Sequence, residues 1–174
     1  MSPVVRIVQL APVTLEALAA GDLDRARRTS SVPLTEWLAG PDCRGTWRYR
    51  AAQVRTTPAD LPWVTGALRS DDEQVAVGKA GFHAAPDADG VVEAGYAVDP
   101  AHRRRGYARA ALELMIERAR EDPMISTFRL TVSPTNTASL GLVAQYPFVE
   151  VGEQWDEEDG LETIYEMSVA SGNG

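Results

Sequence analysis

The sequence contains little that would support disulfide, metal or membrane chemistry. It has a single cysteine, Cys43, which excludes an internal disulfide and a cysteine metal cage. Its apolar runs fall short of the ~18 to 20 residues that a membrane helix needs. The N-terminal segment MSPVVRIVQL lacks the charged and apolar regions of a signal peptide. We therefore expect a soluble, cytoplasmic protein that uses no metal and has no membrane partner.

Basic residues are also scarce. The 174 residues include 17 Lys and Arg against 25 Asp and Glu, which gives a formal net charge of -8. Lys79 is the only lysine, and we attach no function to it. Nucleic-acid binding depends on dense neutralisation of phosphates by basic side chains. This excess of acidic over basic residues therefore argues against a nucleic-acid partner and favours a small or basic one. The length suits one domain, residues 1–174.

Patterning divides this domain into two regions. Residues 1–70 show short helical periodicity interrupted by glycine and proline, and from residue 73 the pattern changes to that of strands. The alternating segments EQVAVGKAGFHAA and VVEAGYAV flank the turn-rich PDADG and predict a hairpin. The segments FVEVGEQW and LETIYEMSV predict a second hairpin around the acidic loop DEEDG.

A long amphipathic helix after Arg105 is the clearest predicted element. Its small and apolar residues recur at helical spacing on one face, at Ala108, Leu112, Met115 and Ala119. The segment ISTFRLTVS then alternates as a strand, and NTASLGLVAQY predicts a short helix capped by Asn136. Helical crossovers between strands require some parallel pairing, so the predicted fold class is α/β.

The stretch VDPAHRRRGYARA places arginines and a glycine directly before this helix. Helix N-termini bind anions through unpaired backbone N–H groups and the positive end of the dipole, and a glycine permits close approach. Arg103, Arg104 and Arg105 would add charge-assisted hydrogen bonds beside Gly106. The pattern indicates an anion site. A solvated turn, and a site for another phosphate ligand such as a nucleotide, are the alternatives.

These residues carry a resemblance to a known family. Arg103-x-x-Gly106-x-Ala108 resembles the Q/R-x-x-G-x-G/A signature of the GNAT superfamily of N-acetyltransferases. Over residues 73–169 the order and spacing of segments are similar to its ribosomal-protein N-acetyltransferase (RimJ/RimL-like) branch. The resemblance implies a mixed central sheet flanked by helices, with residues 1–70 on the acceptor side and 73–169 as the cofactor-binding core. Members often form dimers, so a homodimer is one option.

The resemblance also implies a site for acetyl-CoA and no metal. In the family the loop binds pyrophosphate, which corresponds here to Arg103, Arg104, Arg105, Gly106, Tyr107 and Ala108. The preceding strand binds the pantetheine arm and offers backbone N–H groups to the thioester oxygen, a surface that would be formed by Tyr96, Ala97 and Val98. Asn136 would bond to the pantetheine as well as cap its helix.

Two positions depart from the family pattern. Many members have a tyrosine seven residues after the asparagine that protonates the departing thiolate, but this position is Val143, and Tyr146 is out of register. The RimJ/RimL-like pattern has a serine three residues after the asparagine, so the resemblance favours Ser139 as proton donor. Pro147 replaces a glycine before Phe148, which alters the turn and keeps the aromatic ring.

Strand phase suggests the general base. Glu93 is opposite in phase to the apolar residues of its strand, so we expect it to face the cleft and accept the amine proton, directly or through a water. A structural ion pair or an exposed carboxylate is the alternative. His83 on the neighbouring strand is the second candidate, because histidine titrates near neutral pH.

The features predict an enzyme, an acetyl-CoA-dependent N-acetyltransferase that acts by direct attack in a ternary complex. Its acceptor would be a primary amine, on a protein or peptide N-terminus or on a small molecule. The acidic cluster between Glu153 and Glu162 is either a solvated hairpin or attracts a cationic acceptor. The departures at Val143 and Pro147 keep an alternative open, a non-catalytic acyl-CoA-binding regulatory or interaction module.

Overall fold

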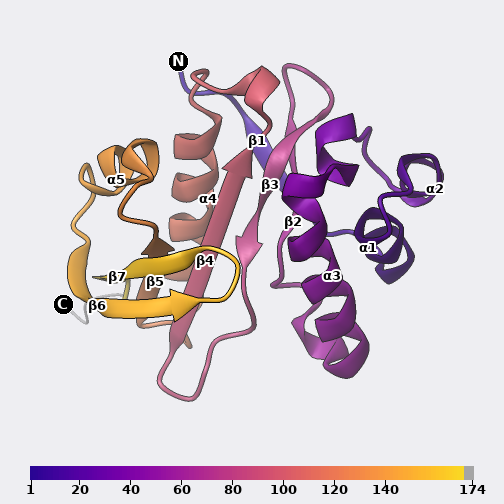
Figure 1. The fold of residues 1–174 in the computed structure, drawn as a ribbon. Helices are drawn as coiled ribbons and strands as arrows, with labels where there is room; N and C mark the ends of the chain where they lie inside the picture. Colours follow the sequence, from indigo (N-terminus) through magenta and orange to yellow (C-terminus); the bar gives the residue numbers. More distant parts are fainter. Residues whose placement is uncertain (171–174) are drawn as a thin grey trace.

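A mixed sheet organises the computed structural model, which describes residues 1–170 (Figure 1). Its strands lie in the order β1-β2-β3-β4-β5-β7-β6, and β4 with β5 is the parallel pair among antiparallel ones. The strands are β1 (Val5–Val8), β2 (Gly66–Ser70), β3 (Ala76–Phe82), β4 (Val91–Val98), β5 (Thr127–Val132), β6 (Val149–Asp156) and β7 (Gly160–Ser168). The helices are α1 (Pro12–Ala19), α2 (Leu23–Thr29), α3 (Pro41–Thr56), α4 (Tyr107–Glu121) and α5 (Thr137–Val143), with short 3-10 turns at Glu36–Ala39, Pro58–Asp60 and Pro100–His102. The predicted α/β class and flanked mixed sheet are confirmed.

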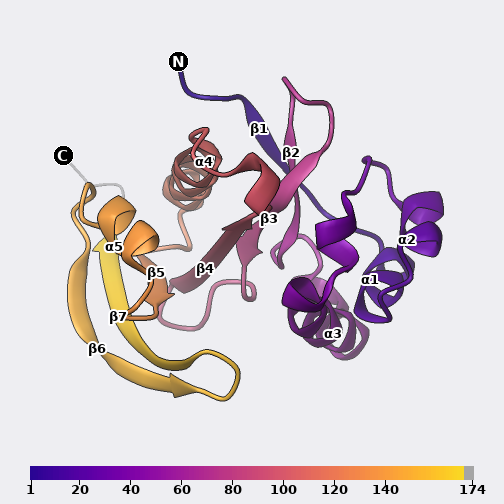
Figure 2. The ribbon, with the colours of Figure 1, turned by 45° about the horizontal axis from the view of Figure 1, so that its top comes forward.

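Different parts of the chain cover the two faces of the sheet. α4 packs on β1, β3 and β4 through its predicted apolar face, where Leu112, Met115 and Ala119 are all buried. On the other side α1 and α3 pack together around Trp47, whose indole N–H donates to the Leu38 carbonyl at 2.7 Å. Figure 2 shows α4 and the α1–α3 group on opposite sides of the strands. No helix within residues 1–170 is long and apolar enough to cross a membrane.

The first 70 residues contain two strands that the sequence patterns did not predict. β1 and β2 are only four and five residues long, too short for alternation to stand out from the surrounding helical signals. They pair with each other and extend the sheet beyond β3. Both predicted hairpins, β3–β4 and β6–β7, are confirmed, and so is the alternating strand β5.

The parallel strands β4 and β5 separate toward their carboxyl ends. Their pairing stops after Ala94 and Leu130. From there β5 continues beside β7 to Val132, and β4 continues beside β3 to Val98. An opening therefore forms in the middle of the sheet, where α5 follows β5 and the arginine loop follows β4.

The hydrogen-bond phase of β4 determines which groups face this opening. His83 N–H donates to the Glu93 carbonyl, in the register that pairs β3 with β4. In an antiparallel ladder the hydrogen-bonded pairs alternate, so the odd-numbered residues of β4 bond to β3. Tyr96 and Val98 consequently turn their backbone N–H and carbonyl groups toward the opening.

Phe128 lies at the centre of the core on the α4 side. It is 0% exposed, and its ring lies 5.9 Å from that of Phe82 and 6.0 Å from that of Phe148. Phe128→Ala should lower the free energy of unfolding by about 3 to 5 kcal/mol, because the surrounding rings cannot refill the vacated volume. Urea denaturation followed by circular dichroism measures this. Trp155→Ala, which removes a ring that is 76% exposed, should cost less than about 0.5 kcal/mol; equal losses would contradict this description of the core.

Candidate active site

Two cavities meet where β4 and β5 separate. The first, which we call the loop cavity, measures about 630 Å³ and lies between the end of β4, the arginine loop and α5. The second, the cleft cavity, measures about 410 Å³ and is lined by β3, β4, β5, α3 and the tip of the β6–β7 hairpin. Both cavities share the lining residues Tyr96, Ala97, Asn136 and Ser139. A ligand that reaches this shared edge from either cavity would therefore contact these four residues.

The arginine loop forms one wall of the loop cavity. Its signature residues Arg103, Arg104, Gly106 and Ala108 line the cavity. Arg104 and Gly106 have φ values of 63° and 85°, so the chain passes through two left-handed positions before α4 begins. This turn leaves the first backbone N–H groups of α4 beside two guanidinium groups, an arrangement that suits a pyrophosphate.

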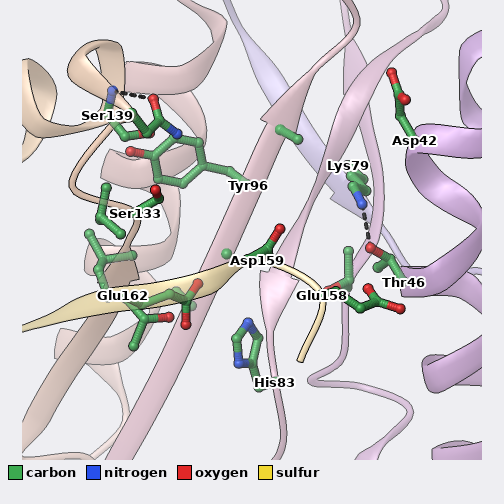
Figure 3. Close-up of a pocket in the computed structure, with 18 of the residues that line it drawn as sticks. Asp42, Thr46, Lys79, His83, Tyr96, Ser133, Ser139, Glu158, Asp159 and Glu162 are labelled. Atoms are coloured by element: carbon green, nitrogen blue, oxygen red, sulfur yellow. Dashed lines mark hydrogen bonds between the residues drawn. The ribbon is translucent and has the colours of Figure 1, made fainter. Parts of the chain in front are cut away.

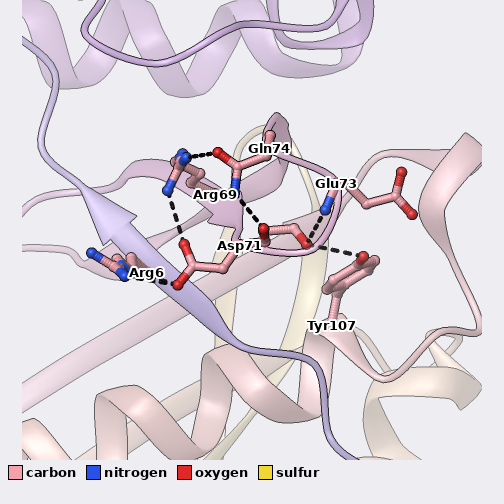
Figure 4. Close-up of polar contacts among 7 residues, drawn as sticks. Arg6, Arg69, Asp71, Glu73, Gln74 and Tyr107 are labelled. Carbon is pink, nitrogen blue, oxygen red and sulfur yellow. Dashed lines mark hydrogen bonds and ion pairs between the residues drawn. The ribbon is translucent and has the colours of Figure 1, made fainter.

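Arg105 and Tyr107 brace this loop from outside. Arg105 Nη1 donates to Glu73 Oε1 at 2.8 Å, so this predicted cofactor residue is engaged in an ion pair with the turn between β2 and β3. The Tyr107 hydroxyl lies 3.2 Å from Ser70 Oγ, which accepts from the Glu73 N–H at 3.1 Å (Figure 4). Because the Tyr107 side chain is 4% exposed, it anchors the first turn of α4 against the sheet.

Three residues bring polar groups to the junction of the two cavities (Figure 3). Asn136 caps α5 as predicted, because its Oδ1 accepts from the Ser139 N–H at 3.1 Å. From β4, the Tyr96 hydroxyl is buried and has no hydrogen-bond partner within residues 1–170. Burial raises the pKa of Tyr96, and the neighbouring Ser139 side chain opposes that shift. The strand pattern and the family resemblance indicate only the backbone of Tyr96, so they give no signal for this hydroxyl.

The two positions that depart from the family pattern lie away from the junction. Val143 is 3% exposed within the core, and the Tyr146 hydroxyl donates to Glu113 on α4 at 2.8 Å. Phe148 keeps its aromatic contact with Phe128 in spite of Pro147. Ser139 and Tyr96 therefore supply the hydroxyl groups at the point where the cavities meet.

Glu93 and His83 form a pair beside the cleft cavity. His83 Nδ1 lies 3.4 Å from Glu93 Oε1, and Thr131 Oγ1 donates to the same oxygen at 2.9 Å. His83 lines the cavity, and its Nε2 lies over Gly95, where a Cβ atom would come within 3.1 Å of it. The carboxylate orients the imidazole, and Gly95 leaves room for the other ring nitrogen on the cavity wall.

The surroundings keep His83 uncharged. Burial and, next, the Arg50 guanidinium lower the pKa of His83 from 6.5 to about 4. Arg50 Nη1 and Gln53 Nε2 also donate to the His83 carbonyl at 3.0 and 2.8 Å, which ties the end of β3 to α3. At neutral pH the imidazole is therefore unprotonated, although the low pKa also makes it a weaker base than a free histidine.

The remaining charges of the cleft cavity come from three elements. Lys79 on β3 and Arg50 on α3 supply the cations, and the acidic residues are Asp42, Glu158, Asp159 and Glu162. Part of the predicted acidic cluster thus lines the cavity instead of facing only solvent. Within residues 1–170 no group of three or more His, Cys, Asp or Glu side chains is placed to hold a metal ion.

Comparison with known proteins identifies the family. The model of the acetyltransferase (GNAT) family matches residues 31–146, which is more than half of the chain. The chain therefore belongs to the GNAT family. No curated protein matches the sequence.

Solved structures share the fold at low sequence identity. A spermidine N-acetyltransferase SpeG chimera from Vibrio cholerae and hSSAT has a TM-score of 0.65 at 11% identity, over 97% of this chain and 96% of that one. The structure of yncA from Salmonella typhimurium, solved with its cofactor acetyl-CoA, has a TM-score of 0.60 at 17% identity, over 100% of this chain and 98% of that one. Ribosomal-protein-S5-alanine acetyltransferase from Vibrio fischeri has a TM-score of 0.60 at 12% identity, over 94% of this chain and 91% of that one. These likenesses support the fold, and the RimJ/RimL-like branch stays a prediction.

Gly106 offers a direct test of the loop cavity. Gly106→Glu should abolish acetyl-CoA binding in calorimetric titration, because it adds a negative charge beside the anion site and imposes on a φ of 85° a side chain whose Cβ would lie 3.2 Å from Pro3. Gly141→Glu is the matched control, since a side chain at Gly141 on α5 would meet no atom within 4 Å. Equal binding by both variants would show that the arginine loop is not the cofactor site.

Proposed function

We propose that the protein is an acetyl-CoA-dependent N-acetyltransferase that transfers an acetyl group to a primary amine within a ternary complex. The observation that carries this proposal is the junction at Tyr96, Ala97, Asn136 and Ser139, which connects a cavity suited to pyrophosphate with one that holds an uncharged imidazole. Membership of the GNAT family and the acetyl-CoA found in the yncA structure support the choice of co-substrate.

The residues of the loop cavity fit acetyl-CoA. Arg103, Arg104 and the N–H groups around Gly106 and Ala108 would hold the pyrophosphate by charge-assisted hydrogen bonds. The backbone groups of Tyr96 face the opening and would pair with a pantetheine amide, while the Val98 carbonyl accepts from Arg103 Nε at 3.1 Å and so ties the arginine loop to the end of β4. Arg105 contributes through Glu73, by holding the loop in this shape.

The cleft cavity supplies the base. His83 Nε2 takes the proton of the acceptor amine, and Glu93 positions the ring through Nδ1, so the base role predicted for Glu93 becomes a positioning role in this proposal. The amine nitrogen attacks the thioester carbon, the C–N bond forms, and the C–S bond breaks. The departing thiolate takes its proton from Ser139, with the buried Tyr96 hydroxyl beside it; water then reprotonates the Ser139 oxygen and takes the proton from His83.

Removing the imidazole tests the base. His83→Gln should lower kcat by about 10²- to 10⁴-fold, the usual contribution of general base catalysis. Glu93→Gln should cost less, because the ring remains and only its orientation is lost. In the wild type, His83 should stay deprotonated down to about pH 4. The acid limb of the plot of kcat against pH should therefore lie near pH 4 instead of near 6.5. Release of the coenzyme A thiol measures these rates.

Acetyl-CoA affinity, measured by calorimetry, separates these losses from misfolding. The control Glu117→Gln, on the exposed side of α4, should leave kcat unchanged. Full activity of His83→Gln with a large loss in Glu93→Gln would make Glu93 itself the base. Acetyl-CoA binding by the wild type without acetylation of any primary amine would favour the non-catalytic acyl-CoA-binding module.

The proton donor can be assigned by two single-atom changes. Ser139→Ala should lower kcat by about 10²-fold or more if its hydroxyl protonates the thiolate, with acetyl-CoA affinity unchanged. Tyr96→Phe should have a smaller effect on kcat. The reverse order of effects would transfer the donor role to the phenol. A thiol-release assay under single-turnover conditions distinguishes the two, because it reports the chemical step apart from product release.

A further inference from the structure

The cleft cavity arranges its charges by depth. Its cations are partly or fully covered, since Arg50 is 7% exposed and Lys79 is half-buried, and both line the cavity wall. Three of its acidic residues, Asp42, Glu158 and Asp159, are exposed at the rim. The fourth, Glu162, is 9% exposed, so the covered part of the cavity holds one carboxylate beside the two cations. An acceptor that reaches the junction with the loop cavity therefore passes acidic groups and then meets both cations and this carboxylate.

Lys79 has no counter-charge of its own. The ion pairs within residues 1–170 do not include it. Its ammonium donates to the Thr46 hydroxyl and lies 6.0 Å from the centre of the Trp47 ring (Figure 3). Burial lowers the pKa of Lys79, and the rim carboxylates only partly oppose this shift. A half-buried ammonium without an anion is unfavourable, and a bound carboxylate would reverse that cost.

Arg50 lies on α3 one turn after Thr46, the residue that accepts from Lys79, and has donor capacity to spare. Its Nη1 bonds to Gln53 and to the His83 carbonyl, while its buried Nε has no hydrogen-bond partner within residues 1–170. Lys79 pairs in register with Ala97, one of the residues shared with the loop cavity. The two cations therefore lie close to both His83 and the proposed thioester position.

We propose that Lys79, with Arg50, forms a carboxylate subsite, so that the acceptor is a small primary amine that also carries a carboxylate, as a free amino acid does. This inference rests on the proposed N-acetyltransferase function and specifies its substrate class. The carboxylate would bind at Lys79 while the amine lies toward His83. A polyamine, or the N-terminal amine of a protein, brings no carboxylate next to the amine, and its positive charge would meet Lys79 unpaired.

Matched ligands test the subsite without any mutation. The protein saturated with coenzyme A, which prevents acetyl transfer, is titrated calorimetrically with free L-amino acids and with the corresponding amino-acid amides. The free amino acid, which carries the carboxylate, should bind about 10- to 100-fold more tightly than its amide, which lacks it. This is the range expected for a hydrogen-bonded ion pair. Spermidine and a short peptide with a free N-terminus and an amidated C-terminus complete the panel.

Variants then locate the effect. Lys79→Met should abolish the preference for amino acid over amide and leave coenzyme A affinity unchanged, while Lys79→Arg should keep the preference. Arg28→Met removes the same charge from an exposed position on α2 and should change nothing. Binding of coenzyme A by Lys79→Met shows that the variant is folded.

The outcomes separate this inference from the proposed function. Equal affinity for amino acids and amides, preference for spermidine or the peptide, or no amino-acid binding at all would overturn the subsite. Carboxylate-dependent binding that disappears in Lys79→Met would support it even if no acetyl transfer followed. In that last case the proposed function would fail while the subsite stood.

Discussion

The separation of β4 from β5 is the constraint on which the rest of the site depends. A continuous sheet would consume the backbone groups of Tyr96 and Val98 in a ladder with β5 and leave no entrance at its centre. Because the parallel pairing stops at Ala94 and Leu130, the groups of Tyr96 become available to a ligand and the Val98 carbonyl can accept from Arg103. The opening also brings the loop after β4 and the helix after β5 to opposite sides of one space. Catalytic and binding residues can then converge from segments that are distant in the sequence.

Electrostatics gives this opening a direction. The arginine loop concentrates positive charge on one side, where α4 begins, and the Glu73 brace keeps Arg105 out of the cavity. On the other side the same sheet carries an imidazole that burial and Arg50 keep neutral. A cationic histidine there could not accept a proton, and it would repel an incoming ammonium. The lowered pKa of His83 therefore keeps the ring neutral at the working pH and lowers its strength as a base.

The sequence predicted the parts of this site that have a local signal. The α4 periodicity and the Arg103-x-x-Gly106 spacing identified the loop, and Asn136 was readable as a cap because capping is a three-residue interaction. His83 was only the second candidate for the base, and its contact with Arg50 gave no local signal, since the two are 33 residues apart and meet only through β3 and α3. Lys79 looked like a compositional accident, and its position across from Ala97 depends on β-strand register, which short-range patterns do not encode.

The acidic hairpin acquires a different meaning once its place in the fold is known. As a sequence feature, the cluster suggested either a solvated hairpin or attraction of a cationic acceptor. In the structure its tip crosses to α3, where a Cβ on Gly45 would come within 2.7 Å of Glu158, so the acids close one side of a cavity whose covered part holds Arg50 and Lys79 beside Glu162. A purely cationic acceptor would gain at the rim and lose at Lys79. A molecule that bears both charges can satisfy rim and interior together, because its amine and its carboxylate each meet a group of opposite sign. The order of charges along the cleft therefore favours a zwitterion over a polycation.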